Sequence, residues 1–163
     1  MPKLSQDSAP QVEESPLPVG RDGELDAELA PHSRVRQLAN DLVAFLETGQ
    51  APDGLFAPNV FFDVTVPHWR LQAQGRDDAV ALRLQQHPAP GRVVRSRLDE
   101  TTNGFVLEFE ERWHENDRDW YARELARADV GEEGITELSV YCTGDWDRAR
   151  EEEHRRTVRL LRP

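Results

Sequence analysis

The residues from Gly104 to Trp146 constrain the fold most, because apolar and polar side chains alternate over three consecutive runs. The runs read GFVLEFEERWHEND, RDWYARELARADVGEEG and ITELSVYCTGDW, and the turn-forming clusters ENDRD and GEEG separate them. Alternation with a period of two places every second side chain on the same face of a strand. The pattern therefore predicts an antiparallel meander with one face buried against a core and the other in solvent.

The length of each turn predicts which residues lie opposite one another. Turns at Asn103-Gly104, Asn116-Asp117 and Gly131–Gly134 predict the pairs Leu98–Phe109, Phe109–Glu124, Trp113–Trp120 and Glu124–Tyr141. In this register apolar and small residues, Val94 and Ser139 among them, share the inner face, and charged residues share the outer face. One acid, Glu124, lies on the inner face. A slip of one residue would reverse the faces of a strand.

The same register places Cys142 and the apolar strip Leu125, Leu138 and Val140 on the outer face. Because Cys142 is the only cysteine, an internal disulfide and a cysteine zinc site are excluded. We expect Cys142 to be covered at a subunit interface rather than to act in catalysis.

The remaining elements are predicted from periodicity, caps and breakers. We expect a helix capped by Ser33 and ended by Gly49, a short helix or turn around APDGLFAPN, and a first strand over Val60–Val66. A short strand follows in VPHWRLQAQG, then a helix opened by Gly75 and closed by Pro88, and a strand over Arg92–Glu100. A last helix is predicted from about residue 145.

The N-terminal segment differs from the rest in composition. Residues 1–32 hold five of the eleven prolines and seven acids, against two basic residues, Lys3 and Arg21. Such a segment buries too little apolar surface to offset its ordering entropy. We expect residues 1–32 to form a disordered, acidic, proline-rich tail and residues 33–163 to form one α+β domain.

Charge and motifs narrow the classes of function. A net charge of −11 without a basic stripe argues against nucleic-acid binding. No apolar run reaches the length of a membrane span and no signal-peptide core is present, so we expect a soluble, cytoplasmic protein. The five histidines lack metal-binding spacing, and no phosphate-binding loop occurs. We therefore predict no metal and no cofactor.

The order of elements, with the stretches LFAPNVFFDVTVP and GRDDAVALRLQ, resembles the nuclear transport factor two-like superfamily over about Ser33 to Asp145. This superfamily includes ketosteroid isomerases, polyketide-cyclase-like (SnoaL-like) proteins and limonene epoxide hydrolases. The ending ELSVYCTGDWD resembles actinobacterial members of unassigned function. The resemblance implies a curved, mainly antiparallel (mixed) sheet wrapped around N-terminal helices into a cone, a deep apolar pocket and frequent homodimers.

Two departures from the superfamily limit what the resemblance implies about chemistry. Val66 stands where ketosteroid isomerases carry their aspartate base. The epoxide hydrolases use an Asp-Arg-Asp set, yet no arginine is predicted on the inner face beside Glu124, because Arg112 and Arg123 point outward. The fold alone does not define a reaction.

The candidate catalytic residues are Glu124, Tyr141 and His68. Glu124 would be a general acid or base whose pKa burial raises, Tyr141 a hydrogen-bond donor to an oxyanion, and His68 an orienting group. The candidate substrate-binding residues are Trp69, Arg70, Phe109, Trp113, Trp120 and Asp63. The alternatives are that Tyr141 only satisfies Glu124 in a structural pair, that a bulge turns Glu124 outward, and that Trp69 packs on the core from an ordinary loop.

We therefore expect a protein that binds a small, largely apolar organic molecule beneath its sheet. If it is an enzyme, it transfers protons without a cofactor, as an isomerase, cyclase or dehydratase does. The alternative is a non-catalytic ligand-binding or protein-interaction module. In either case we expect a homodimer that associates through the outer face of the sheet.

Overall fold

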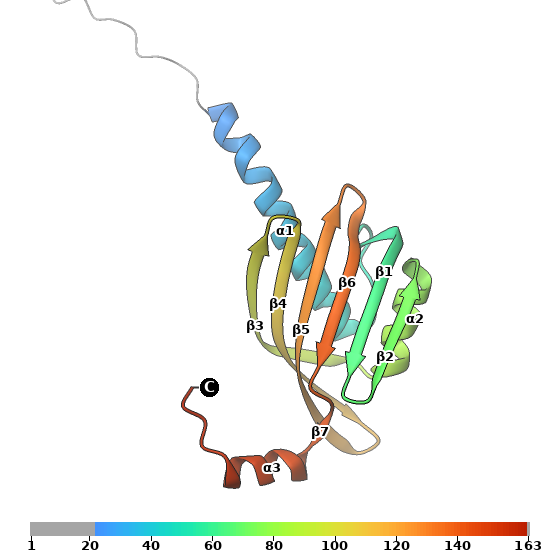
Figure 1. The fold of residues 1–163 in the computed structure, drawn as a ribbon, viewed down its shortest axis with the longest axis vertical. Coiled ribbons are helices and arrows are strands. Elements are labelled where there is room, and N and C mark those ends of the chain that lie inside the picture. The colour runs from blue at the N-terminus through green and yellow to red at the C-terminus, as the bar shows by residue number, and fades with distance from the viewer. Residues whose placement is uncertain (1–21, 163) are drawn as a thin grey trace, which may run out of the picture.

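The computed structural model describes residues 22–162, and the side chains of residues 34–162. Within residues 22–162, three helices and seven strands follow one another (Figure 1): α1 (Asp22–Thr48), β1 (Phe56–Val66), β2 (Trp69–Gln74), α2 (Arg76–Gln86), β3 (Gly91–Thr101), β4 (Gly104–Glu115), β5 (Arg118–Gly131), β6 (Gly134–Cys142), β7 (Trp146–Asp147) and α3 (Arg148–Thr157).

The strands form a single mixed sheet. Its order is β2-β1-β6-β5-β4-β3, and β7 pairs with β5. Neighbouring strands are antiparallel except β1 and β6, which are parallel. Figure 1 shows α1 passing behind the sheet, α2 beside the β1–β2 edge, and α3 beyond the ends of the long strands. The architecture is thus the α+β class with a curled, open sheet that the sequence predicts.

The core lies between the sheet and the helices. Leu38, Leu42 and Phe45, which recur at helical spacing in α1, are buried against the inner face. Phe45 meets Phe56 of β1 edge to face, with ring centroids 5.4 Å apart. Each such fully buried side chain contributes about 1.5–3 kcal/mol of transfer free energy, so this interface holds α1 on the sheet.

The β4–β5 hairpin has the predicted register. Asn116 and Asp117 adopt left-handed φ angles of 52° and 58°, which suit the two-residue turn whose twist matches a hairpin. Trp113 therefore lies opposite Trp120, and Phe109 lies opposite Glu124. Glu124 faces inward and is 4% exposed, so its predicted placement on the buried face is confirmed.

The predicted register of β5 and β6 is wrong by one residue. Val130 pairs with Ile135 as the turn length requires, but Asp129 then pairs with Glu137, so that Thr136 forms a bulge. The Thr136 hydroxyl donates to the Asp129 carbonyl oxygen over 3.1 Å.

The bulge reverses the faces of the rest of β6. Glu124 lies opposite Cys142, and Tyr141 lies opposite Leu125. Leu138 and Val140 are therefore buried in the core, whereas Tyr141 is 56% exposed and Ser139 shares its face. The predicted outer strip of Leu125, Leu138 and Val140 does not exist, and Cys142 lies on the inner side of the sheet.

The predicted register of β3 and β4 is wrong by two residues. Thr101 pairs with Gly104, so Leu98 lies opposite Leu107 and Ser96 opposite Phe109. Gly104 pairs with Thr101 and with Asp129, so it belongs to the strand and not to the turn. Only glycine fits there, because a Cβ on Gly104 would overlap the Ala128 carbonyl oxygen.

A second register shift, between Val93 and Arg95, affects the face of Val94. Val94 is 51% exposed rather than inward as predicted, while Val93 packs against the core. The shift adds one residue to β3 relative to β4, which turns the preceding side chains to the opposite face.

Two local predictions near the N-terminus need correction. Helix α1 begins at Asp22 rather than at Ser33. The helix gains DGELDAELAPH before Ser33. The segment DGELDAELA consists mostly of good helix formers with acids at the N-terminal end, which the helix dipole favours, whereas Pro31 lies inside the helix without an N–H to donate. Residues 22–32 of the predicted tail are thus helical, and residues 1–21 lie outside the described residues. The stretch APDGLFAPN forms a turn at Asp53-Gly54, and β1 begins within it.

We predict that Gly104→Ala lowers the free energy of unfolding by about 3 kcal/mol, because the new methyl group would overlap the backbone of β5. Gly54→Ala is the matched control: its φ is 78°, but no atom lies within 4 Å of the new Cβ. The control should cost about 1 kcal/mol from backbone strain alone. Urea unfolding measures both, and equal losses would contradict the close approach of β4 and β5.

Candidate functional site

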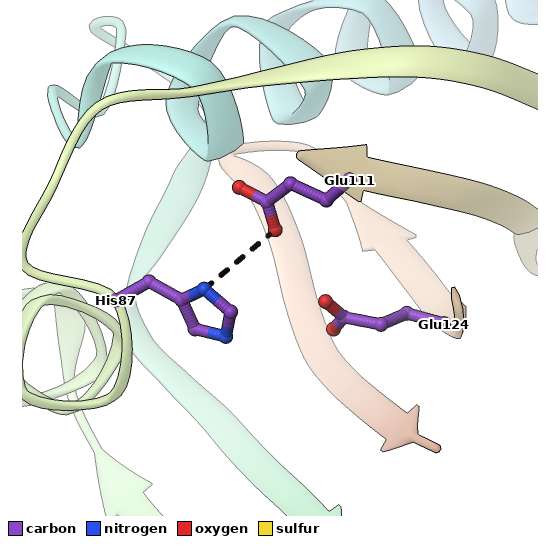
Figure 2. Close-up of side chains that lie close together, drawn as sticks. All are labelled: His87, Glu111 and Glu124. Atoms are coloured by element: carbon purple, nitrogen blue, oxygen red, sulfur yellow. Dashed lines mark ion pairs between the residues drawn. The ribbon is translucent and has the colours of Figure 1, made fainter. Parts of the chain in front are cut away.

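Four polar or charged residues are buried among residues 34–162: Arg83, His87, Glu111 and Glu124. They lie in one cluster beneath the sheet. Figure 2 shows His87, Glu111 and Glu124 extending toward one another from the end of α2 and from two adjacent strands. A buried charge is costly unless it is paired, so this cluster is the first place to look for function.

Local structure positions all four side chains. Arg83 and His87 are four residues apart, which places them on one side of α2 and its C-terminal cap. Glu111 pairs with Ala122 and Phe109 pairs with Glu124, so the two acids are diagonal neighbours on the inner face of β4 and β5. The cluster is therefore fixed by regular elements rather than by loops.

Arg83 and Glu111 form a buried ion pair. The Arg83 Nη2 atom lies 2.6 Å from Glu111 Oε1 and also donates to the Leu46 carbonyl oxygen of α1 over 3.2 Å. Both side chains are almost fully buried. Burial raises the pKa of Glu111, and the positive charge and hydrogen bond of Arg83 oppose that shift.

His87 packs between Glu111 and the tryptophan pair. Its ring centroid is 4.5 Å from that of Trp113, which in turn stacks on Trp120 at 6.4 Å. Burial, followed by the charge of Arg83, lowers the pKa of His87 to about 3. The imidazole is therefore neutral near pH 7, and its 3.9 Å contact with Glu111 is not an ion pair there.

Glu124 is a deeply buried acid whose pKa is raised by its surroundings. Burial raises the pKa of Glu124 to about 8; the charge of Arg83 opposes this rise, and the charges of Glu111 and Asp145 add to it. The adjacent Glu111 carboxylate also favours the protonated form of Glu124, because that form could share its proton with Glu111. Opposite Glu124, burial and the charge of Glu124 raise the pKa of the Cys142 thiol to about 12, so that thiol is not a ready nucleophile.

A cavity of about 30 Å³ adjoins the cluster. Its lining is mainly apolar: Leu42, Phe45, Leu46, Phe62, Val64, Val66, Phe109, Ala126, Leu138 and Val140, with Arg83, Gln86, His87, Glu124 and Cys142 as the other members. The volume admits one or two water molecules. It is well below the roughly 300–1,000 Å³ of most small-molecule sites.

The structure brings together only some of the predicted site residues. Glu124 and Phe109 line the cavity, Trp113 contacts His87, and Trp120 stacks on Trp113. Tyr141 lies on the opposite face of the sheet from Glu124 because of the β6 bulge, so the predicted Glu124–Tyr141 pair is wrong.

The predicted site residues His68, Trp69, Arg70 and Asp63 lie apart from the cavity. His68, Trp69 and Arg70 are exposed at the β1–β2 hairpin, and Trp69, at 71% exposure, does not pack on the core. Asp63 alternates with the cavity-lining Phe62 and Val64, so it faces the other side of β1. There it accepts hydrogen bonds from Arg70, with Arg70 Nε 3.0 Å from Asp63 Oδ1.

Sequence reasoning missed Arg83, His87 and Glu111. Glu111 was detectable, because it falls on the inward parity between Phe109 and Trp113. Arg83 and His87 continue the four-residue spacing from the buried Ala79. The strands were predicted to place no arginine on the inner face beside Glu124. Arg83 supplies an inward-facing arginine from α2.

Comparison with solved structures places this geometry in a known fold. An NTF2-like (nuclear transport factor two-like) protein from Anabaena variabilis superposes with a TM-score of 0.59 at 14% identity, covering 78% of this chain and 96% of that one. A proposed polyketide cyclase from Xanthomonas campestris gives 0.55 at 16% identity, covering 67% and 90%. A hypothetical protein from Catenulispora acidiphila with a ketosteroid isomerase-like fold, in complex with trimethylamine, gives 0.52 at 11% identity, covering 66% and 85%.

These likenesses show the fold: the chain has the NTF2-like α+β architecture that its element order indicates. No family model matches the sequence. No curated protein matches it either. Within the described residues, no helix is both long and apolar enough to cross a membrane.

We predict that Arg83→Met lowers the free energy of unfolding by about 3–5 kcal/mol, because it leaves Glu111 buried without its partner. Arg148→Met is the matched control, since the Arg148–Glu152 pair on α3 is largely exposed at 2.9 Å. That control should change stability by less than about 1 kcal/mol. Chemical denaturation of both variants measures the difference, and a mild effect at Arg83 would show that the pair is dispensable.

Proposed function

We propose that the chain binds a small, largely apolar organic molecule beneath its sheet and transfers protons on it without a cofactor, in a reaction of the isomerase, cyclase or dehydratase type. The observation that carries this proposal is the placement of Glu124. Its carboxyl group is buried at the wall of a mainly apolar cavity, and none of the described residues forms a hydrogen bond with its Oε1 atom. A group held in that way is available to a bound molecule.

The neighbouring residues supply the other requirements of proton transfer. An ionised Glu124 would take a proton from a carbon beside a carbonyl group, and the resulting acid would return it to another atom of the same molecule. Arg83 lines the same cavity and carries a fixed positive charge, so it would stabilise the enolate formed between the two steps. Arg83 thus replaces Tyr141 as the candidate oxyanion partner.

The fold neighbours support this class of function without fixing the substrate. They include a proposed polyketide cyclase and a protein with a ketosteroid isomerase-like fold in complex with trimethylamine. A cavity of about 30 Å³ requires the lining side chains to move before any but a very small molecule enters. We therefore favour a compact substrate.

Deuterium exchange tests the proposal without a known substrate. Small aliphatic and cyclic ketones are incubated with the protein in D₂O containing a chelator, and NMR measures loss of the proton beside the carbonyl. We expect exchange above the buffer rate, reduced about 10²- to 10⁴-fold in Glu124→Gln. Glu108→Gln removes an outward acid paired with Arg123 and should leave the rate unchanged. Wild-type exchange at the buffer rate, or equal rates in Glu124→Gln and wild type, would contradict the proposal.

The alternative is a non-catalytic interaction module, and two observations favour it. The cavity is small, and the outer face carries an exposed apolar pair, Leu125 and Tyr141, directly opposite each other on β5 and β6. We propose that this pair lies at the centre of a homodimer interface across the outer face of the sheet, because adjoining exposed apolar side chains mark association sites.

Sedimentation velocity tests the dimer separately from the chemistry. The wild-type chain should sediment as a dimer, and Leu125→Arg should sediment as a monomer with an unchanged circular dichroism spectrum. Val94→Arg is the control, since Val94 is exposed on β3 away from this pair. A monomeric wild type, or a dimer that survives Leu125→Arg, would rule out this interface.

A further inference from the structure

Three buried side-chain atoms have no hydrogen-bond partner among the residues that the structure describes: His87 Nδ1, Glu111 Oε2 and Glu124 Oε1. They belong to the three residues drawn in Figure 2. Leaving a polar atom buried and unpaired costs about 1–3 kcal/mol. Three such atoms in one cluster therefore point to an occupant that satisfies them together.

The spacing of the three residues limits what that occupant is. Each offers one ligand atom, and the three ligand atoms lie within 4.8 Å of one another. In a tetrahedral site with ligand distances of about 2.0–2.2 Å, the ligand atoms lie about 3.3–3.6 Å apart. Each of the three atoms therefore needs to move by no more than about 1 Å, which rotation of its side chain allows.

We propose that His87, Glu111 and Glu124 bind a single divalent transition-metal ion. One imidazole nitrogen and two carboxylate oxygens form a donor set that suits zinc, manganese or ferrous iron. This site differs from the sequence prediction, which expects no metal because the histidines lack a binding motif. The ligands come from three separate elements, so no local spacing reveals them.

The charge of the cluster favours a cation. With both acids ionised, Glu111 and Glu124 carry two negative charges and Arg83 carries one positive charge, so one negative charge remains without a partner. A proton on Glu124 would remove that charge but leave His87 Nδ1 unsatisfied. A water molecule would satisfy the three atoms but bring no charge. A divalent ion satisfies the three atoms and more than offsets the negative charge.

The surroundings also hold the ligands in place. Arg83 binds the other carboxylate oxygen of Glu111, and the ring of His87 packs against Trp113. Partners of this kind orient the ligands of metal sites. Because His87 and Glu124 also line the cavity, a metal held by three protein ligands would keep an open coordination position facing it.

This inference goes beyond the proposed proton transfer, although both involve Glu124. A bound ion would act as a Lewis acid toward a molecule in the cavity. The two are tested apart: deuterium exchange is measured with chelator present, and metal binding is measured with no organic substrate. Either result stands if the other fails.

Cobalt titration tests the site. The full chain is stripped with a chelator, the chelator is removed, and Co²⁺ is added while the visible absorption of the ion is recorded. We expect saturation at one ion per chain and displacement by Zn²⁺. His87→Gln and Glu124→Gln should each weaken binding at least tenfold, with circular dichroism confirming that the variants fold.

The matched control is His114→Gln, which removes an exposed histidine 2.9 Å from Asp119 and should leave the titration unchanged. Failure of the wild-type chain to bind Co²⁺ or Zn²⁺ would overturn the proposal and leave a water molecule or a shared proton as the occupant. Binding that is lost in His114→Gln but kept in His87→Gln would overturn it as well, because the ion would then lie at the surface.

Discussion

The ion pair between Arg83 and Glu111 joins the parts of this domain that meet beneath the sheet. Arg83 extends from α2 and donates hydrogen bonds to Glu111 of β4 and to the Leu46 carbonyl oxygen near the end of α1. Taking both charges out of water costs several kcal/mol, which short and well-aligned hydrogen bonds offset only in part. The chain therefore keeps a polar centre where apolar residues of similar size would pack at lower cost.

The buried Arg83–Glu111 pair limits the charge states that Glu124 can adopt. The Arg83–Glu111 pair is close to neutral as a unit, so a second buried acid needs either a proton or a cation to balance it. A proton on Glu124 would support acid–base catalysis at the cavity. A cation would support a metal site with an open coordination position. Both follow from the same placement of one carboxyl group beside a small apolar cavity.

The bulge at Thr136 determines which side chains of β6 face the cavity and which face the outer surface of the sheet. By adding one residue to β6, it turns Cys142 toward Glu124 and turns Tyr141 outward beside Leu125. Tyr141 therefore does not lie beside Glu124 in the cavity. Instead, Tyr141 and Leu125 form an exposed apolar pair on the opposite face of the sheet. A single extra residue thus assigns one side chain to a pocket and another to a surface suited to association.

The sequence alone determined the features that rest on local interactions. Hydrophobic alternation and the Asn116-Asp117 turn were sufficient to predict the long hairpin, the inward side of Glu124 and the Trp113–Trp120 pair. The order of helices and strands was sufficient to predict the NTF2-like fold. Only the tertiary structure decided the faces of β6, because the bulge depends on pairing with β5. It also decided the composition of the site, because Arg83, His87 and the two acids meet only when α2 packs beneath strands far away in the chain.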